Sequence, residues 1–153
     1  GFRINHYQDF KKELEKAEDL LIIGDNSGEG VFDKLLIQEI KNYYNLKIYY
    51  GVRAVPVLND ITLKEAREIG LDETATLINS GSKAPGLIMK YATAEFKEIF
   101  NNSDLILSKG QGNYESLSEK NYSSIYFLLK AKCQVIAREF EVKPGSLVLQ
   151  SQL

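Results

Sequence analysis

Residues 19–25, with the sequence DLLIIGD, decide the fold of this chain. Four consecutive apolar residues are followed by Gly24 and Asp25. A short apolar run that ends in glycine and an acid is typical of a buried β-strand that leads into a turn. The next stretch, residues 29–44, has apolar side chains at helical spacing. Residues 19–44 are therefore predicted to form a strand, a turn and a helix.

The same alternation continues along the chain. Helices are expected at residues 7–17, 29–44, 62–70, 93–103 and 132–140, and strands at 19–25, 45–52, 75–80, 104–110, 123–129 and 146–150. Residues 54–60, 80–86 and 110–116 are expected to be loops. Thr62 and Glu65 have the spacing of a capping box at the start of the third helix. Strands that alternate with helices predict an α/β fold with an open, mainly parallel sheet and helices on both faces, a Rossmann-like three-layer sandwich.

Composition narrows the classes of function. The chain has 153 residues, 44% of them apolar, which suits one globular domain. The formal net charge of −2 gives no general attraction to nucleic acid or to an anionic membrane. Its apolar runs are too short to cross a bilayer and the N-terminal residues have no signal-peptide core, so we expect a cytoplasmic protein.

A single cysteine and a single histidine limit the chemistry. Cys133 excludes an internal disulfide and a Cys-rich zinc site, and we interpret it as a buried helix residue. His6 lies far from the other candidate residues in the sequence, so a Ser-His-Asp or Cys-His mechanism is disfavoured. Carboxylates, amides, lysine and a metal ion are left as the means of catalysis.

Polar residues follow four of the predicted strands. In a parallel sheet these positions meet at one edge, where ligands bind. A functional cluster explains all four groups together better than separate turns and caps do. The groups are Asp25-Asn26, Arg53 with Asn59-Asp60, Asn79-Ser80-Gly81, and Lys109-Gly110 with Asn113.

The residue types indicate a metal-assisted reaction of a phosphate ester. Asp25, Asn26 and Asp60 offer the hard oxygen ligands that magnesium and manganese prefer. Lys109 would hold the phosphate or offset charge in the transition state. Glu29, in a glycine-rich turn at the start of a helix, is a candidate general base.

Each of these residues also has a purely structural interpretation. Asn26 would serve as a helix N-cap, and Asp60 as part of the cap of the next helix. Lys109 would be solvated, and the glycines around it would form a tight turn. Glu29 would only complement the helix dipole. Arg53 would anchor a loop carboxylate instead of contacting the substrate, and both interpretations of Arg53 stay open.

Five segments resemble the damage-control phosphatases, metal-dependent enzymes long catalogued as a domain of unknown function, number eighty-nine. The resemblance covers residues 18–150 and rests on the combination of these segments in one order. They are GDNSGEGVFDKLL, VRAVPVLNDIT, NSGSKAPG, KGQGNYESL and LLKAKCQVIA. Ser27 and Ala54 depart mildly from the family pattern, which usually has alanine and glycine there.

The resemblance implies a function and a site. It implies an α/β phosphomonoester hydrolase that uses Mn, Mg, Co or Ni and acts on a small phosphorylated metabolite, such as a sugar phosphate or a damaged or side-product phosphate ester. The implied metal ligands are Asp25, Asn26 and Asp60, and the implied phosphate-contacting lysine is Lys109. The remaining candidates for substrate or phosphate binding are Glu29, Arg53, Asn79, Ser80, Gly81, Gly110 and Asn113.

The resemblance also implies a division of the chain. The family has a helical segment before the GDN strand that supplies walls of the substrate pocket. We expect residues 1–17 to be an N-terminal helix that remains from that segment, and residues 18–153 to be the α/β metal-binding phosphatase domain.

Two other classes of function compete with a phosphatase. A receiver-like phosphoacceptor module also combines acids, a hydroxyl and a lysine, here Asp25, Asp60, Ser80 and Lys109, but it normally has adjacent acids after its first strand. The other alternative is a non-catalytic nucleotide- or metal-binding domain. Against nucleotide binding, no G-x-G-x-x-G loop follows the first predicted strand. A haloacid-dehalogenase type is disfavoured because Ser27 stands where its second aspartate is required.

Overall fold

The structure, a computed structural model, describes residues 1–122 and 124–152. Among these residues, no helix has the length and apolar character needed to cross a membrane. The elements in chain order are β1 (Phe2–Asn5), α1 (Tyr7–Lys16), β2 (Asp19–Ile23), η1 (Ser27–Glu29), α2 (Gly30–Tyr43), β3 (Lys47–Val52), α3 (Leu63–Glu68), η2 (Leu71–Glu73), β4 (Thr76–Asn79), η3 (Met89–Tyr91), α4 (Ala94–Asn102), β5 (Leu105–Lys109), α5 (Gln111–Leu117), β6 (Ile125–Lys130), α6 (Gln134–Glu139) and β7 (Leu147–Ser151).

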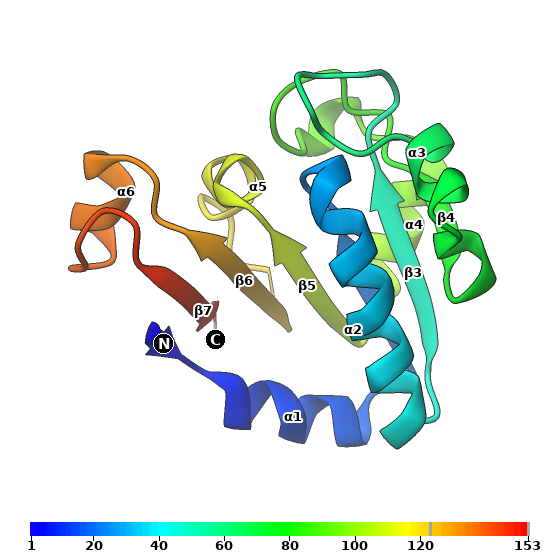
Figure 1. Cartoon of the computed structure of the whole chain (residues 1–153), viewed down its shortest axis with the longest axis horizontal. Helices are drawn as coiled ribbons and strands as arrows, with labels where there is room; N and C mark the ends of the chain where they lie inside the picture. The colour runs from blue at the N-terminus through cyan, green and yellow to red at the C-terminus, as the bar shows by residue number, and fades with distance from the viewer. Residues whose placement is uncertain (123, 153) are drawn as a thin grey trace.

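One seven-stranded sheet runs through the molecule in the order β1-β7-β6-β5-β2-β3-β4 (Figure 1). All neighbouring strands are parallel except β6 and β7, which pair antiparallel. β2 lies between β3 and β5, and four of its five residues are buried. A parallel strand that is covered on both faces reads as a continuous apolar run, which explains why residues 19–25 predict it so clearly.

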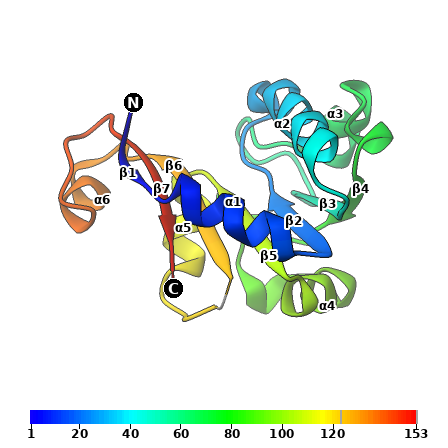
Figure 2. The same ribbon diagram turned by 90° about the horizontal axis from the view of Figure 1, so that it is seen from below.

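Helices cover both faces of the sheet and give two apolar cores (Figure 2). On one face, Phe10 of α1 and Ile37 of α2 pack with Ile22 of β2. On the other face, Phe96 of α4 and Ile136 of α6 belong to the second cluster. The predicted fold class is therefore confirmed.

Several local features differ from the sequence prediction. β1 was not predicted, because it is short and three of its four residues are exposed, yet it pairs with β7. Residues 111–117 form α5 where a loop was expected. Gly112 and Asn113 are weak helix formers, but the packing of Tyr114 and Leu117 in the core overrides that preference. Of the strand expected at 123–129, β6 confirms residues 125–129, whereas Ser123 lies outside the described residues.

The predicted capping box of α3 is confirmed. The Thr62 side chain and the Glu65 side chain each bond to the other residue's backbone. Cys133 differs from its interpretation, because it is half-buried at the N-cap position of α6.

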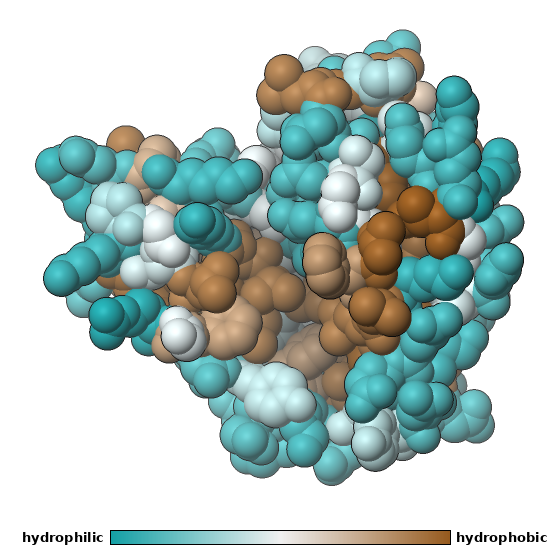
Figure 3. Space-filling view, in the orientation of Figure 1, coloured by the Kyte–Doolittle hydropathy of each residue, from teal (hydrophilic) through white to brown (hydrophobic). Residues whose placement is uncertain are grey.

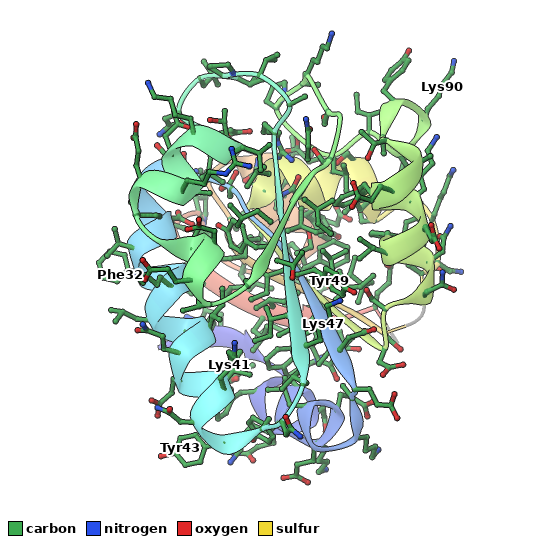
Figure 4. All side chains as sticks on the ribbon, turned by 90° about the vertical axis from the view of Figure 1, so that its right-hand side faces the viewer. Phe32, Lys41, Tyr43, Lys47, Tyr49 and Lys90 are labelled. Carbon is green, nitrogen blue, oxygen red and sulfur yellow. The ribbon has the colours of Figure 1, made fainter. Side chains whose placement is uncertain are left out.

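The apolar stripe predicted for α2 is only partly buried. Ile40 is buried, but Phe32 is 71% exposed, and Tyr43 and Leu35 are also exposed. Figure 4 shows Phe32 and Tyr43 pointing away from the sheet, and Figure 3 shows apolar side chains at the surface on this side of the molecule. The buried side of α2 instead includes Asp33.

Truncation of a buried and of an exposed phenylalanine should have different effects on the free energy of unfolding. Phe96→Ala should lower the free energy of unfolding by about 3–5 kcal/mol, because Phe96 is fully buried. Phe32→Ala should change it by less than about 0.5 kcal/mol, because most of its side chain is in solvent. Urea unfolding followed by circular dichroism would measure both. A large loss in Phe32→Ala would contradict the exposed position of Phe32.

Candidate active site

The candidate site lies where the order of the parallel strands reverses. The chain runs outward from β2 to β3 and β4, then returns to place β5 on the other side of β2. Ligands of open α/β sheets bind beyond the carboxyl ends of the strands at such a switch point. Ile23 pairs with Gly51 on one side and with Ser108 on the other. Beyond these pairs, Gly110 lies against Asp25, and Ile61 lies between Asp25 and Arg53, because the Ile61 amide donates to the Asp25 carbonyl and the Ile61 carbonyl accepts from the Arg53 amide.

Gly110 allows β5 to approach Asp25 closely. Its φ of +86° is in the left-handed region, and a Cβ atom at this position would overlap the Asp25 carboxylate. Only glycine satisfies both conditions without strain. Gly110 was predicted to bind phosphate, and the structure places it against the first predicted metal ligand.

The three predicted metal ligands lie together. Asn26 and Asp60 pair in an isolated antiparallel bridge, and the Ile61 amide donates to the Asp25 carbonyl at 2.8 Å. The Asn26 side-chain nitrogen lies 3.4 Å from Asp25 Oδ2, so its amide group faces that carboxylate. The Asn26 side chain makes no capping hydrogen bond to η1, which removes the interpretation of Asn26 as a simple N-cap.

Arg53 connects two of the strand-end loops. Only 1% of it is exposed, and its Nε donates to Asp60 Oδ2 at 3.0 Å. Its Nη2 donates to Asn113 Oδ1 at 2.7 Å. Its Nη1 is buried and makes no hydrogen bond to the described residues. These contacts match the anchoring interpretation of Arg53, while contact with a substrate stays a prediction.

Asn113 extends this connection to two more strands. It is fully buried, and its side-chain nitrogen donates to the carbonyls of Lys109 at 2.7 Å and Gly24 at 3.2 Å. It therefore fixes the ends of β2 and β5 relative to Arg53. Its predicted role in phosphate binding is not needed to explain any of these contacts.

Lys109 is buried between two carboxylates. It is 8% exposed, and its Nζ contacts Asp33 Oδ1 and lies 3.2 Å from Glu29 Oε2. The interpretation of Lys109 as a solvated residue is therefore wrong. Asp33 was not singled out from the sequence, although it precedes Ile37 by one helical turn and so shares its buried face.

The Asn79-Ser80-Gly81 segment makes mostly local contacts. Asn79 Oδ1 accepts from the Gly81 amide at 2.8 Å, and Ser80 Oγ accepts from the Ser82 amide at 3.2 Å. Gly81 has a φ of +79° against the backbone of Thr93. The segment is joined to the end of β3, because the Ser80 amide donates to the Val52 carbonyl at 2.9 Å and the Ala54 amide donates to the Ser82 carbonyl at 3.1 Å. Phosphate binding by this segment stays a prediction.

The electrostatics of the cluster fit a cation. Burial, followed by the negative charges of Asp60 and Glu29, raises the pKa of Asp25 to about 6, although Lys132 and Arg53 act in the opposite direction. Crowded carboxylates of this kind are stabilised by a bound cation. Lys132, an exposed cation near Asp25, was not singled out from the sequence.

The residues offer a hard, oxygen-rich ligand set. In residues 1–122 and 124–152, no three His, Cys, Asp or Glu side chains are grouped to hold a metal ion. A site made of Asp25, Asp60 and the Asn26 amide, completed by water, does not require such a group. One Asp60 oxygen is bound by Arg53, which leaves the other free to act as a ligand.

Replacement of Asp25 should reveal the cost of its charge. The pKa of Asp25 is higher in the folded chain than its ordinary value of 3.8, so the folded chain holds this proton more tightly than the unfolded chain does. The free energy of unfolding therefore falls as the pH rises from about 4 to above 6. Asp25→Asn removes this loss. In EDTA, the variant should melt at a higher temperature than the unmodified chain at pH 8, and the difference should vanish near pH 4. Equal melting temperatures at pH 8 would contradict the crowding of negative charge around Asp25.

Known proteins resemble the chain over almost its whole length. Residues 1–148 match the family described as the damage-control phosphatase ARMT1-like domain. A damage-control phosphatase of Pyrococcus horikoshii is 41% identical over 145 residues, which are 95% of this chain and 50% of that protein. A damage-control phosphatase of Archaeoglobus fulgidus is 38% identical over 149 residues, 97% of this chain and 51% of that protein.

A solved structure shows the same fold. The crystal structure of a DUF89 family protein from Pyrococcus horikoshii superimposes with a TM-score of 0.96 at 39% sequence identity, and covers 100% of this chain and 54% of that one. The chain thus spans about half the length of the curated relatives it matches. The match over residues 1–148 shows that the chain belongs to the damage-control phosphatase ARMT1-like family.

Proposed function

We propose that this chain carries the catalytic centre of a metal-dependent phosphatase for small phosphorylated metabolites, such as sugar phosphates or damaged or side-product phosphate esters. The observation that supports the proposal most is the meeting of Asp25, Asn26 and Asp60 at the switch point of the sheet, beside Lys109. Family membership supports the same class of reaction.

Asp25, Asn26 and Asp60 would hold the metal. Mg, Mn, Co and Ni all accept ligand sets rich in oxygen, and the chemistry of the site does not select one of them. When bound, a divalent ion supplies a Lewis acid for a phosphoryl oxygen. The part of the protein would be to orient the ligands, as Arg53 does for Asp60 through a partly buried hydrogen bond.

The phosphate would meet cations at the same edge. Lys109 ends β5 directly before Gly110, so its ammonium group serves the same edge as Asp25. A positioned cation stabilises the charge that develops on the equatorial oxygens of a transferring phosphoryl group. Glu29 is the candidate general base, and attack by Asp25 and attack by water are both compatible with the arrangement.

Hydrolysis of an aryl phosphate by the 153-residue chain would test the proposal. We expect turnover that requires Mn²⁺, Co²⁺, Ni²⁺ or Mg²⁺ and that falls at least about a hundredfold in Asp25→Ala and Asp60→Ala, because each removes a ligand. Asp72→Ala, at an exposed acid in η2, is the matched control and should keep full activity. Full activity of either ligand variant, with its circular dichroism spectrum unchanged, would exclude this site.

A further inference from the structure

Lys109 belongs to a buried network that the proposed chemistry does not use. Asp33 contacts Lys109 with Oδ1, and its Oδ2 accepts a hydrogen bond of 2.6 Å from the Tyr50 hydroxyl. Asp33 is 2% exposed and Tyr50 is fully buried. Each oxygen of the Asp33 carboxylate thus has one fixed partner, one from β5 and one from β3.

Tyr50 is locked in its role as a donor. Burial and the adjacent Asp33 carboxylate raise the pKa of Tyr50 well above its usual range, so the hydroxyl keeps its proton. Its ring lies against Gly24, where any Cβ atom would collide with it. The ring therefore packs against the residue that joins the end of β2 to Asp25.

The two carboxylates around Lys109 differ in their freedom to move. Asp33 is enclosed on the buried face of α2, whereas 47% of the Glu29 side chain is exposed, at the end of η1. Among the described residues, the Glu29 side chain makes one hydrogen bond, the one from Lys109. An incoming phosphate competes with Glu29 for Lys109 at little structural cost, but competition with Asp33 would leave a buried charge unpaired.

We propose that Asp33, held by Tyr50, is a positioning residue that keeps Lys109 fixed while Glu29 gives up its place on Lys109 to the phosphate of the substrate. This inference rests on the proposed function, since it assigns the anion that Lys109 receives. A lysine has a flexible four-carbon stem, and ordering it costs conformational entropy. Because Asp33 orders Lys109 in advance, phosphate binding does not bear that cost.

Affinity for inorganic phosphate tests the network directly. Phosphate would be titrated by calorimetry into the 153-residue chain saturated with Mg²⁺. Tyr50→Phe should weaken phosphate binding about fivefold, because Asp33 loses the hydrogen bond that fixes it. Glu29→Gln should tighten it about threefold, because a competing negative charge is removed. Tyr49→Phe, next to Tyr50 on β3 and with Lys47 over its ring, should leave the affinity unchanged.

Two further variants complete the series. Asp33→Asn should weaken phosphate binding at least about tenfold, and if it fails to fold, Tyr50→Phe still carries the test. In a chain that carries Lys109→Ala, the added substitution Glu29→Gln should no longer change the affinity for phosphate. A purely structural network would shift melting temperatures and leave phosphate affinity alone. The opposite signs expected for Tyr50→Phe and Glu29→Gln are specific to positioning.

The result separates this inference from the proposed function. Phosphate affinities that follow this pattern in a chain without aryl phosphate turnover would support the network and count against catalysis. Metal-dependent turnover with the same phosphate affinity in Tyr50→Phe, Glu29→Gln and the unmodified chain would overturn the inference alone. Absence of phosphate binding by the unmodified chain would overturn it as well.

Discussion

The buried guanidinium group of Arg53 is the contact on which the arrangement of the site depends. Arg53 directly follows β3, and its guanidinium group donates to Asp60 in the next loop and to Asn113 in α5. Asn113 in turn bonds to the backbone at the ends of β2 and β5. A buried charge of this kind is tolerated only when it is paired and hydrogen-bonded. Loss of Asp60 would leave the charge of Arg53 unpaired, and loss of Asn113 would leave Nη2 without this hydrogen bond, so both contacts hold the loops together.

This constraint explains why negative charge is concentrated beside Asp25. Asp25 and Asp60 are brought together by backbone pairing, while Arg53 faces Asp60 and Lys109 faces Asp33 and Glu29. Four carboxylates therefore meet two buried cations, and Asp25 has no ion pair among the described residues. Functional sites commonly retain such unfavourable electrostatics because a ligand relieves them. We therefore propose that the cluster is prepared for a divalent cation, at a cost in the stability of the metal-free chain.

Much of this was predictable from sequence, for physical reasons. The run at residues 20–23 predicts β2 because a doubly covered parallel strand must be apolar throughout. The polar residues after the strands predict where the candidate site lies, because parallel strands end at a common edge. α5 was not predictable in the same way, since its glycine and asparagine residues resemble a loop and only packing against β5 and β6 makes them helical. The roles of Asp33 and Tyr50 depend on contacts between residues that are 17 positions apart, which no local pattern encodes.

A crystal structure of the 153-residue chain with Mn²⁺ tests the central claim most directly, because the anomalous scattering of manganese locates the ion without reference to activity. The account predicts one strong anomalous peak bounded by the side chains of Asp25, Asn26 and Asp60. A peak at another place in a correctly folded chain, or none at saturating Mn²⁺, would contradict the assignment of these residues as the metal site.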